Sequence, residues 1–94
     1  MVRPTEEIKP YIDEHHPFHI IRTFTSLVDP EELIWHRDRK DREIVAVSGD
    51  GWKLQLDNEM PIELSSDRKY KIPKGTFHRI LKGDGDLILK IKEY

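Results

Sequence analysis

Residues 33–57, LIWHRDRKDREIVAVSGDGWKLQLD, contain two strand-like segments around a glycine-rich turn and indicate the fold class. At the end of this stretch, residues 52–57 alternate apolar and polar side chains, as a strand does when one face is buried and the other meets water. Residues 44–47 are apolar and largely β-branched, which favours a more deeply buried strand. The intervening Gly-Asp-Gly at 49–51 is typical of a turn. We therefore expect two strands joined by a tight turn.

The same pattern extends to both sides of this stretch. Short segments rich in β-branched, aromatic or aliphatic residues occur at 18–24, 33–38, 62–64, 70–72, 76–81 and 87–91. Turn-forming residues separate them, at 29–30, 57–59, 65–67, 73–75 and 83–85. Regular spacing of short strands is typical of a β-sandwich or closed barrel, and no segment has a long helical period. We predict an all-β fold, a single small antiparallel β-barrel or jelly roll.

The chain of 94 residues has room for one domain. Residues 1–17 are polar and have no sustained period, so we expect an irregular N-terminal arm, with the barrel domain at 18–94. His15, His16 and His19 lie close together, but Pro17 prevents the helix that would stack two of them. We interpret these histidines as a solvated surface cluster.

Composition excludes several kinds of partner. Sixteen basic and eighteen acidic residues give a net charge of -2 without a basic block, so we expect no nucleic-acid partner. There is no cysteine, and any metal must be held by histidines and carboxylates. No run approaches the ~18 apolar residues of a membrane span, so we expect a cytoplasmic protein without a membrane partner. The small core favours a homodimer, because a second copy would bury more surface.

Four residues stand out from the ordinary strand pattern. His36 and Asp38 are two positions apart in a predicted strand, so their side chains share one face and converge. Glu43 places a carboxylate at the head of an apolar strand, and His78 opens another strand, at 76–81. Such a set of histidines and carboxylates has the chemistry of a metal site.

The chain resembles the cupin superfamily in two motifs that contain these residues. The first motif is approximately G-x5-H-x-H-x3-4-E-x6-G, and His36-x-Asp38-x4-Glu43 reproduces its spacing with Asp38 in place of the second histidine. The second is approximately G-x5-P-x-G-x2-H-x3-N, and Pro73-x-Gly75-x2-His78 matches its centre. Asp67 stands at its leading glycine position, and Lys82 stands at its trailing asparagine position. Two such motifs in the right order are more specific than either alone.

The resemblance implies one divalent metal inside the barrel. The implied ligands are His36, Asp38, Glu43 and His78, and this donor set suits Fe(II), Mn(II) or Zn(II). Two carboxylates would balance the charge of the metal. A small-molecule ligand beside it is expected, with Trp35, Trp52 and Phe77 either lining its pocket or belonging to the core. The same barrel hosts oxygenases, isomerases, epimerases and non-catalytic proteins, so the resemblance does not select a reaction.

Two other functions fit the same residues. His36, Asp38 and His78 also match the H-x-D…H facial triad of non-haem iron oxygenases. A 2-oxoglutarate enzyme of that class would need a basic anchor, for which Arg79, Lys82 and Lys90 are candidates. The other alternative is a metal-free binding or assembly module, because Asp38 lies in the mixed-charge run 37–42, which is typical of a solvated loop.

Overall fold

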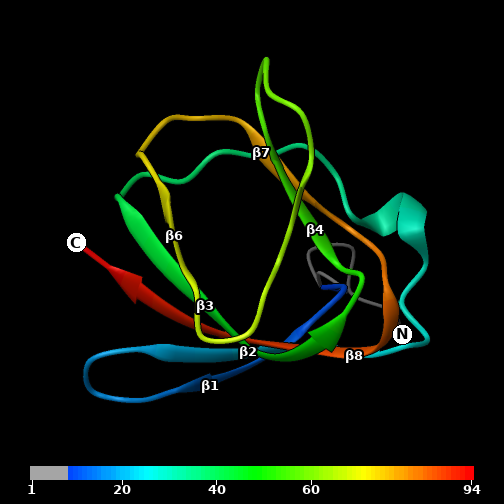
Figure 1. Cartoon of the computed structure of the whole chain (residues 1–94). Helices are drawn as coiled ribbons and strands as arrows, with labels where there is room; N and C mark the ends of the chain where they lie inside the picture. Colours follow the sequence, from blue (N-terminus) through cyan, green and yellow to red (C-terminus); the bar gives the residue numbers. More distant parts are fainter. Residues whose placement is uncertain (1–8) are drawn as a thin grey trace, which may run out of the picture.

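The computed structural model describes residues 9–94, which form two antiparallel sheets (Figure 1). The five-stranded sheet has the order β1 (Ile12–His15), β2 (Ile20–Phe24), β8 (Asp84–Glu93), β3 (Arg42–Asp50) and β6 (Lys69–Ile72). The three-stranded sheet has the order β5 (Ile62–Glu63), β4 (Lys53–Leu56) and β7 (His78–Leu81). In Figure 1 the strands curve around a common interior. A single 3-10 turn, η1 (Pro30–Glu32), lies between β2 and β3, and no helix in this part of the chain could span a membrane.

The predicted all-β, jelly-roll type of fold is confirmed, with differences at two segments. Residues 33–38, expected to be a strand, make only an isolated bridge at His36. Conversely, Ile12–His15, expected to lie in an irregular arm, forms β1 and pairs with β2 from Ile12↔Thr23 to His15↔Ile20. Both differences have one cause. Whether a segment is a strand depends on which backbone lies beside it, and local composition does not specify that partner.

The core lies on the inner faces of the two sheets. The alternation predicted for residues 52–57 is present, because Trp52 and Leu54 are buried while Lys53 is exposed. The indole nitrogen of the fully buried Trp52 donates to the carbonyl of Asp84 at 3.2 Å, which satisfies its one polar group. The remaining buried hydrophobic residues are Phe24, Val28, Ile44, Ala46, Leu64, Tyr70, Ile72, Ile80, Leu87, Leu89 and Ile91.

A buried ion pair joins β1 to β2. Asp13 and Arg22 are directly opposite in the register, and Nε and Nη2 of Arg22 donate to the two carboxylate oxygens at 2.8 and 2.9 Å. The ring of Tyr11 covers the guanidinium, 3.6 Å away. Burial by itself raises the pKa of Asp13, but the hydrogen bonds and charge of Arg22 outweigh it, so the pKa lies below its usual 3.8. The hairpin is therefore an integral part of the sheet.

This ion pair predicts a specific dependence of stability on pH. A carboxyl whose folded-state pKa is lowered stabilises the protein above its unfolded pKa and loses that contribution as pH falls through the folded pKa. We expect the wild-type protein to be more stable than Asp13→Asn at about pH 6, with the difference shrinking below the usual pKa of 3.8. Urea unfolding of both proteins between about pH 6 and about pH 3 measures this difference. A difference that is constant over the whole range would contradict the assignment.

Candidate metal centre

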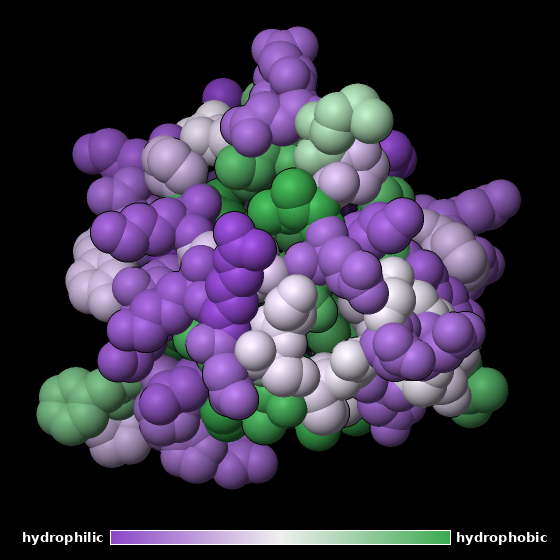
Figure 2. Space-filling model, in the orientation of Figure 1, coloured by the Kyte–Doolittle hydropathy of each residue, from purple (hydrophilic) through white to green (hydrophobic). Residues whose placement is uncertain are grey.

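A cavity of about 670 Å³ lies in the interior, lined by residues of both sheets. The five-stranded sheet contributes apolar side chains such as Ile44 and Leu89, and β7 contributes His78 and Ile80. Figure 2 shows hydrophobic atoms near the centre of one face, surrounded by hydrophilic side chains. A cavity of this size suits a small-molecule ligand.

Two histidines face this cavity from neighbouring backbones. His36 and His78 exchange both of their backbone hydrogen bonds, at 3.0 and 2.8 Å, and are directly opposite in an antiparallel bridge. Directly opposite residues project their side chains to the same side, which brings the ring centroids to 4.2 Å. The turn before β7 fixes the position of His78, since Gly75 has φ +77° and Thr76 donates back to the carbonyl of Pro73. Long-range pairing thus creates the histidine pair.

Both imidazoles have the same orientation relative to their own backbone. Nδ1 of His36 lies 3.0 Å from the carbonyl oxygen of Ile34, and Nδ1 of His78 lies 2.8 Å from that of Thr76. A carbonyl only accepts, so in each neutral ring Nδ1 carries the proton and donates it. Each Nε2 is therefore left with a free lone pair. Histidine ligands of metals are commonly oriented by such carbonyl contacts.

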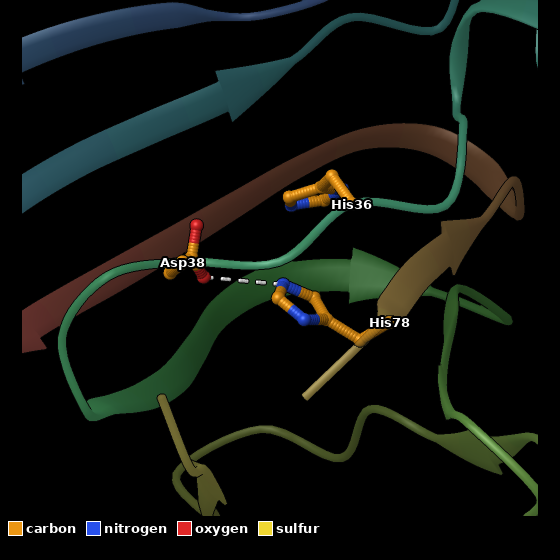
Figure 3. A group of neighbouring side chains, drawn as sticks. All are labelled: His36, Asp38 and His78. Carbon is orange, nitrogen blue, oxygen red and sulfur yellow. Dashed lines mark ion pairs between the residues drawn. The ribbon is translucent and has the colours of Figure 1, made fainter. Parts of the chain in front are cut away.

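Asp38 completes the group shown in Figure 3. Its Oδ1 lies 3.3 Å from Nη1 of Arg42, and its Oδ2 lies 3.3 Å from Nε2 of His78. Oδ2 is buried and has no hydrogen-bond partner. With Nε2 of His78 unprotonated, two lone pairs face each other across 3.3 Å, and a metal ion between them, or a proton on Nε2, would relieve their repulsion.

Three of the four expected ligands come together, and Glu43 does not join them. One donor atom from each of His36, Asp38 and His78 lies within 4.8 Å of the others, and this is the only such group of three within residues 9–94. The carboxylate of Glu43 lies instead 3.9 Å from Nζ of Lys69, and Glu43 lines a separate cavity of about 450 Å³.

Strand alternation explains the position of Glu43. Side chains alternate along β3, and Ile44 points into the core. Arg42, two positions before it, therefore also points inward and lines the cavity, whereas the adjacent Glu43 points outward. The family motif places its glutamate after a gap of three or four residues, which counted from Asp38 leads to position 42 or 43. Of these two positions, only 42 faces the cavity, and it is occupied by Arg42. The buried Ile44 is the signal in the sequence that could have made this distinction. The guanidinium of Arg42 therefore lies beside Asp38, in place of a carboxylate that could have been a fourth ligand.

Other residues singled out in the sequence lie away from this group. Arg79 donates to Gln55, Lys82 donates to the carbonyl of Val28, and neither these two nor Lys90 lines the 670 Å³ cavity. Trp52 belongs to the core, whereas Trp35 and Phe77 are 40% and 42% exposed and contact arginines. The stacked rings of His16 and His19, with His16 paired to Glu14, form a separate cluster near the β1–β2 turn.

No protein-family model matches the chain, and no curated protein matches it in sequence. Solved structures do match. KdgF from Halomonas sp. has a TM-score of 0.63 at 17% identity, covering 94% of this chain and 84% of that one. Protein NMB1881 from Neisseria meningitidis has a TM-score of 0.60 at 16% identity, covering 96% and 88%.

A cupin domain, bp2299, from Bordetella pertussis Tohama I has a TM-score of 0.57 at 15% identity and covers 95% of this chain and 98% of its own. The chain has a cupin fold. Likeness at these identities establishes the fold alone, so the chemistry of this protein rests on its own residues.

The residues of this site fit a divalent metal. Two imidazole nitrogens with free lone pairs and one carboxylate oxygen are a donor set that suits Fe(II), Mn(II) and Zn(II), and the unpartnered Oδ2 of Asp38 is directed toward His78. Burial lowers the pKa of His78 below its usual 6.5, against the opposing effect of its hydrogen bond to Thr76. The neutral, metal-binding form of the ring is thereby favoured over the imidazolium.

Proposed function

We propose that this cupin binds one divalent metal ion through Nε2 of His36, Nε2 of His78 and a carboxylate oxygen of Asp38, next to a cavity that holds a small molecule. The buried Oδ2 of Asp38, unpartnered and 3.3 Å from Nε2 of His78, is the observation that carries the proposal. A metal ion would satisfy both atoms together, whereas a buried carboxylate oxygen left alone is destabilising.

The residues around the ligands prepare this site in three ways. The carbonyls of Ile34 and Thr76 hold both imidazoles in the tautomer that exposes Nε2. Arg42 pairs with Oδ1 of Asp38 and leaves Oδ2 directed toward Nε2 of His78. Glu93 in turn holds the guanidinium of Arg42 through Nε and Nη2, at 3.0 and 2.9 Å. Outer contacts of this kind orient metal ligands and tune their affinity.

Three protein ligands leave coordination positions for a small molecule. When bound, a divalent metal would supply Lewis acidity for a ligand oxygen in the cavity. The protein contributes an apolar wall, including Ile44, Ile80 and Leu89, that excludes water from one side of that ligand. We propose Fe(II), Mn(II) or Zn(II) as the metal, because imidazole and carboxylate donors suit these ions and thiolate-preferring ions have no cysteine to bind.

Metal analysis tests the proposal. The protein is prepared without a histidine tag, stripped with EDTA and dialysed against Zn(II), Mn(II) or anaerobic Fe(II), and the bound metal is measured by mass spectrometry. We expect about one ion per chain for at least one metal. His36→Ala and His78→Ala should each weaken binding by about a hundredfold or more, since even outer contacts are worth 10–100-fold.

His19→Ala is the matched control, because His19 belongs to the separate cluster with His16 and should leave metal binding unchanged. The proposal fails if the wild-type protein binds no metal stoichiometrically, or if neither His36→Ala nor His78→Ala weakens binding. In that case a metal-free cupin with a binding or assembly role becomes the better description.

A further inference from the structure

The charged residues that line the 670 Å³ cavity are mostly cationic. Within residues 9–94 they are Lys9, Arg22, Arg42 and Glu32, set in a lining that is otherwise largely aliphatic and aromatic. Lys9 and Glu32 are exposed, whereas Arg22 is buried, so Arg22 is the cation that lies deepest among the charged residues of the lining. Charges inside a low-dielectric cavity act on a ligand more strongly than surface charges do.

The carboxylates that pair with the two arginines do not line the cavity. Asp13 pairs with Arg22, and Glu93 and Asp38 pair with Arg42, but none of these acids belongs to the cavity lining. The two arginines thus line the cavity, whereas the acids that pair with them do not. A ligand in the cavity meets the positive end of each ion pair first, which favours an anionic group.

The two arginines differ in how many of their guanidinium nitrogens are already paired with carboxylates. Arg42 uses Nε and Nη2 on Glu93 and Nη1 on Asp38, so all three of its nitrogens are engaged. Arg22 uses Nε and Nη2 on Asp13, and its Nη1 lies outside this pair. Arg22 is thus better able than Arg42 to bind an anionic group of a ligand. A single binding arginine suits a ligand with a single anionic group.

Arg22 is also held rigidly. It is only 8% exposed, its guanidinium makes two short bonds to Asp13, and the ring of Tyr11 stacks on it at 3.6 Å. Its neighbours on the inner face of β2, Ile20 and Phe24, are apolar, so a charge at this position interrupts an apolar row. A preorganised guanidinium loses little entropy on binding an anion.

We propose that the cavity binds a small organic monocarboxylate, with its carboxylate held by Arg22 and its apolar body packed against the aliphatic wall. This inference rests on the proposed function of the cavity as a small-molecule site and names the chemical class of its ligand. Three features support it together: the mainly cationic lining, the Arg22 guanidinium, whose Nη1 has no hydrogen-bond partner among residues 9–94, and the apolar surface around it.

Hexanoate and hexanamide are the probes, since they match in size and differ in charge. Binding of each is measured by titration calorimetry and by amide chemical-shift changes, on zinc-loaded and on EDTA-treated protein. We expect hexanoate to bind at least about tenfold more tightly than hexanamide, the size of one charge-assisted hydrogen bond. Equal binding of the two probes in both forms of the protein would overturn the proposal.

Variants identify the anchor. Arg22→Gln should weaken hexanoate binding about tenfold and leave hexanamide binding unchanged. Arg79→Gln is the control, because Arg79 contacts Gln55 and Trp35 outside the cavity, and it should change neither. Asp13→Asn guards against a simple loss of folding, since it disturbs the same hairpin but leaves the Arg22 charge in place, so it should keep the preference for hexanoate over hexanamide. Loss of that preference in Asp13→Asn as well would overturn the role of Arg22.

The two forms of the protein separate this inference from the metal proposal. If no metal binds, but hexanoate still binds EDTA-treated protein in a manner that depends on Arg22, the ligand class is supported and the metal site fails. If zinc binds stoichiometrically and hexanoate shows no preference over hexanamide, the ligand class fails and the metal site stands.

Discussion

Gly83→Ala is expected to destabilise the protein by about 3 kcal/mol, a large share of the roughly 5–15 kcal/mol that is typical of a folded domain. A Cβ at this position would lie inside the van der Waals radii of the carbonyl oxygen of Asp50, the amide nitrogen of Trp52 and the carbonyl carbon of Gly51. All three are backbone atoms of the connection between β3 and β4. They cannot rotate away as the end of a side chain could, so the two backbones would have to separate.

Gly85→Ala is the matched control for this substitution. Gly85 has φ +65°, but a Cβ there would meet nothing within 4 Å, so only the strain of a left-handed backbone remains, about 1 kcal/mol. Urea unfolding followed by tryptophan fluorescence compares both variants with the wild type. If Gly83→Ala proves no less stable than Gly85→Ala, the close approach of the two backbones is wrong.

Asp38→Asn is expected to weaken metal binding by about a hundredfold or more, whereas Glu43→Gln should change it by less than about twofold. Asp38 provides the only carboxylate in the group with His36 and His78, and its neutral amide replacement is a poorer donor for a divalent ion. Glu43 contacts Lys69 beside another cavity, so loss of its charge removes only a weak surface pair.

The same stripped protein and metal titrations measure both variants, and urea unfolding checks that each remains folded. Equal losses of affinity in the two variants would mean that Glu43 reaches the metal, as the family motif implies. A loss in Glu43→Gln alone would overturn the three-residue site.

Much of the fold and part of the site follow from local sequence. Six of the expected strand segments after residue 38 correspond to β3 through β8, because alternation and turn residues are properties of neighbouring positions. The convergence of His36 and Asp38 was predicted for the same reason, although the expected strand there is only a bridge. The role of Arg22 in the cavity could not be predicted from the sequence, because Arg22 lies in a segment with the pattern of an ordinary apolar strand.

The all-β architecture, the donor chemistry without cysteine and the placement of His36 and Asp38 on one side thus follow from local sequence. The neighbours of each segment follow only from the folded chain: His36 lies opposite His78, Arg42 rather than Glu43 contacts Asp38, and Gly83 packs against the turn before Trp52. The difference arises from distance along the chain. Alternation orders side chains within one strand, whereas contacts between residues some 30 to 50 positions apart are set by how the whole core packs.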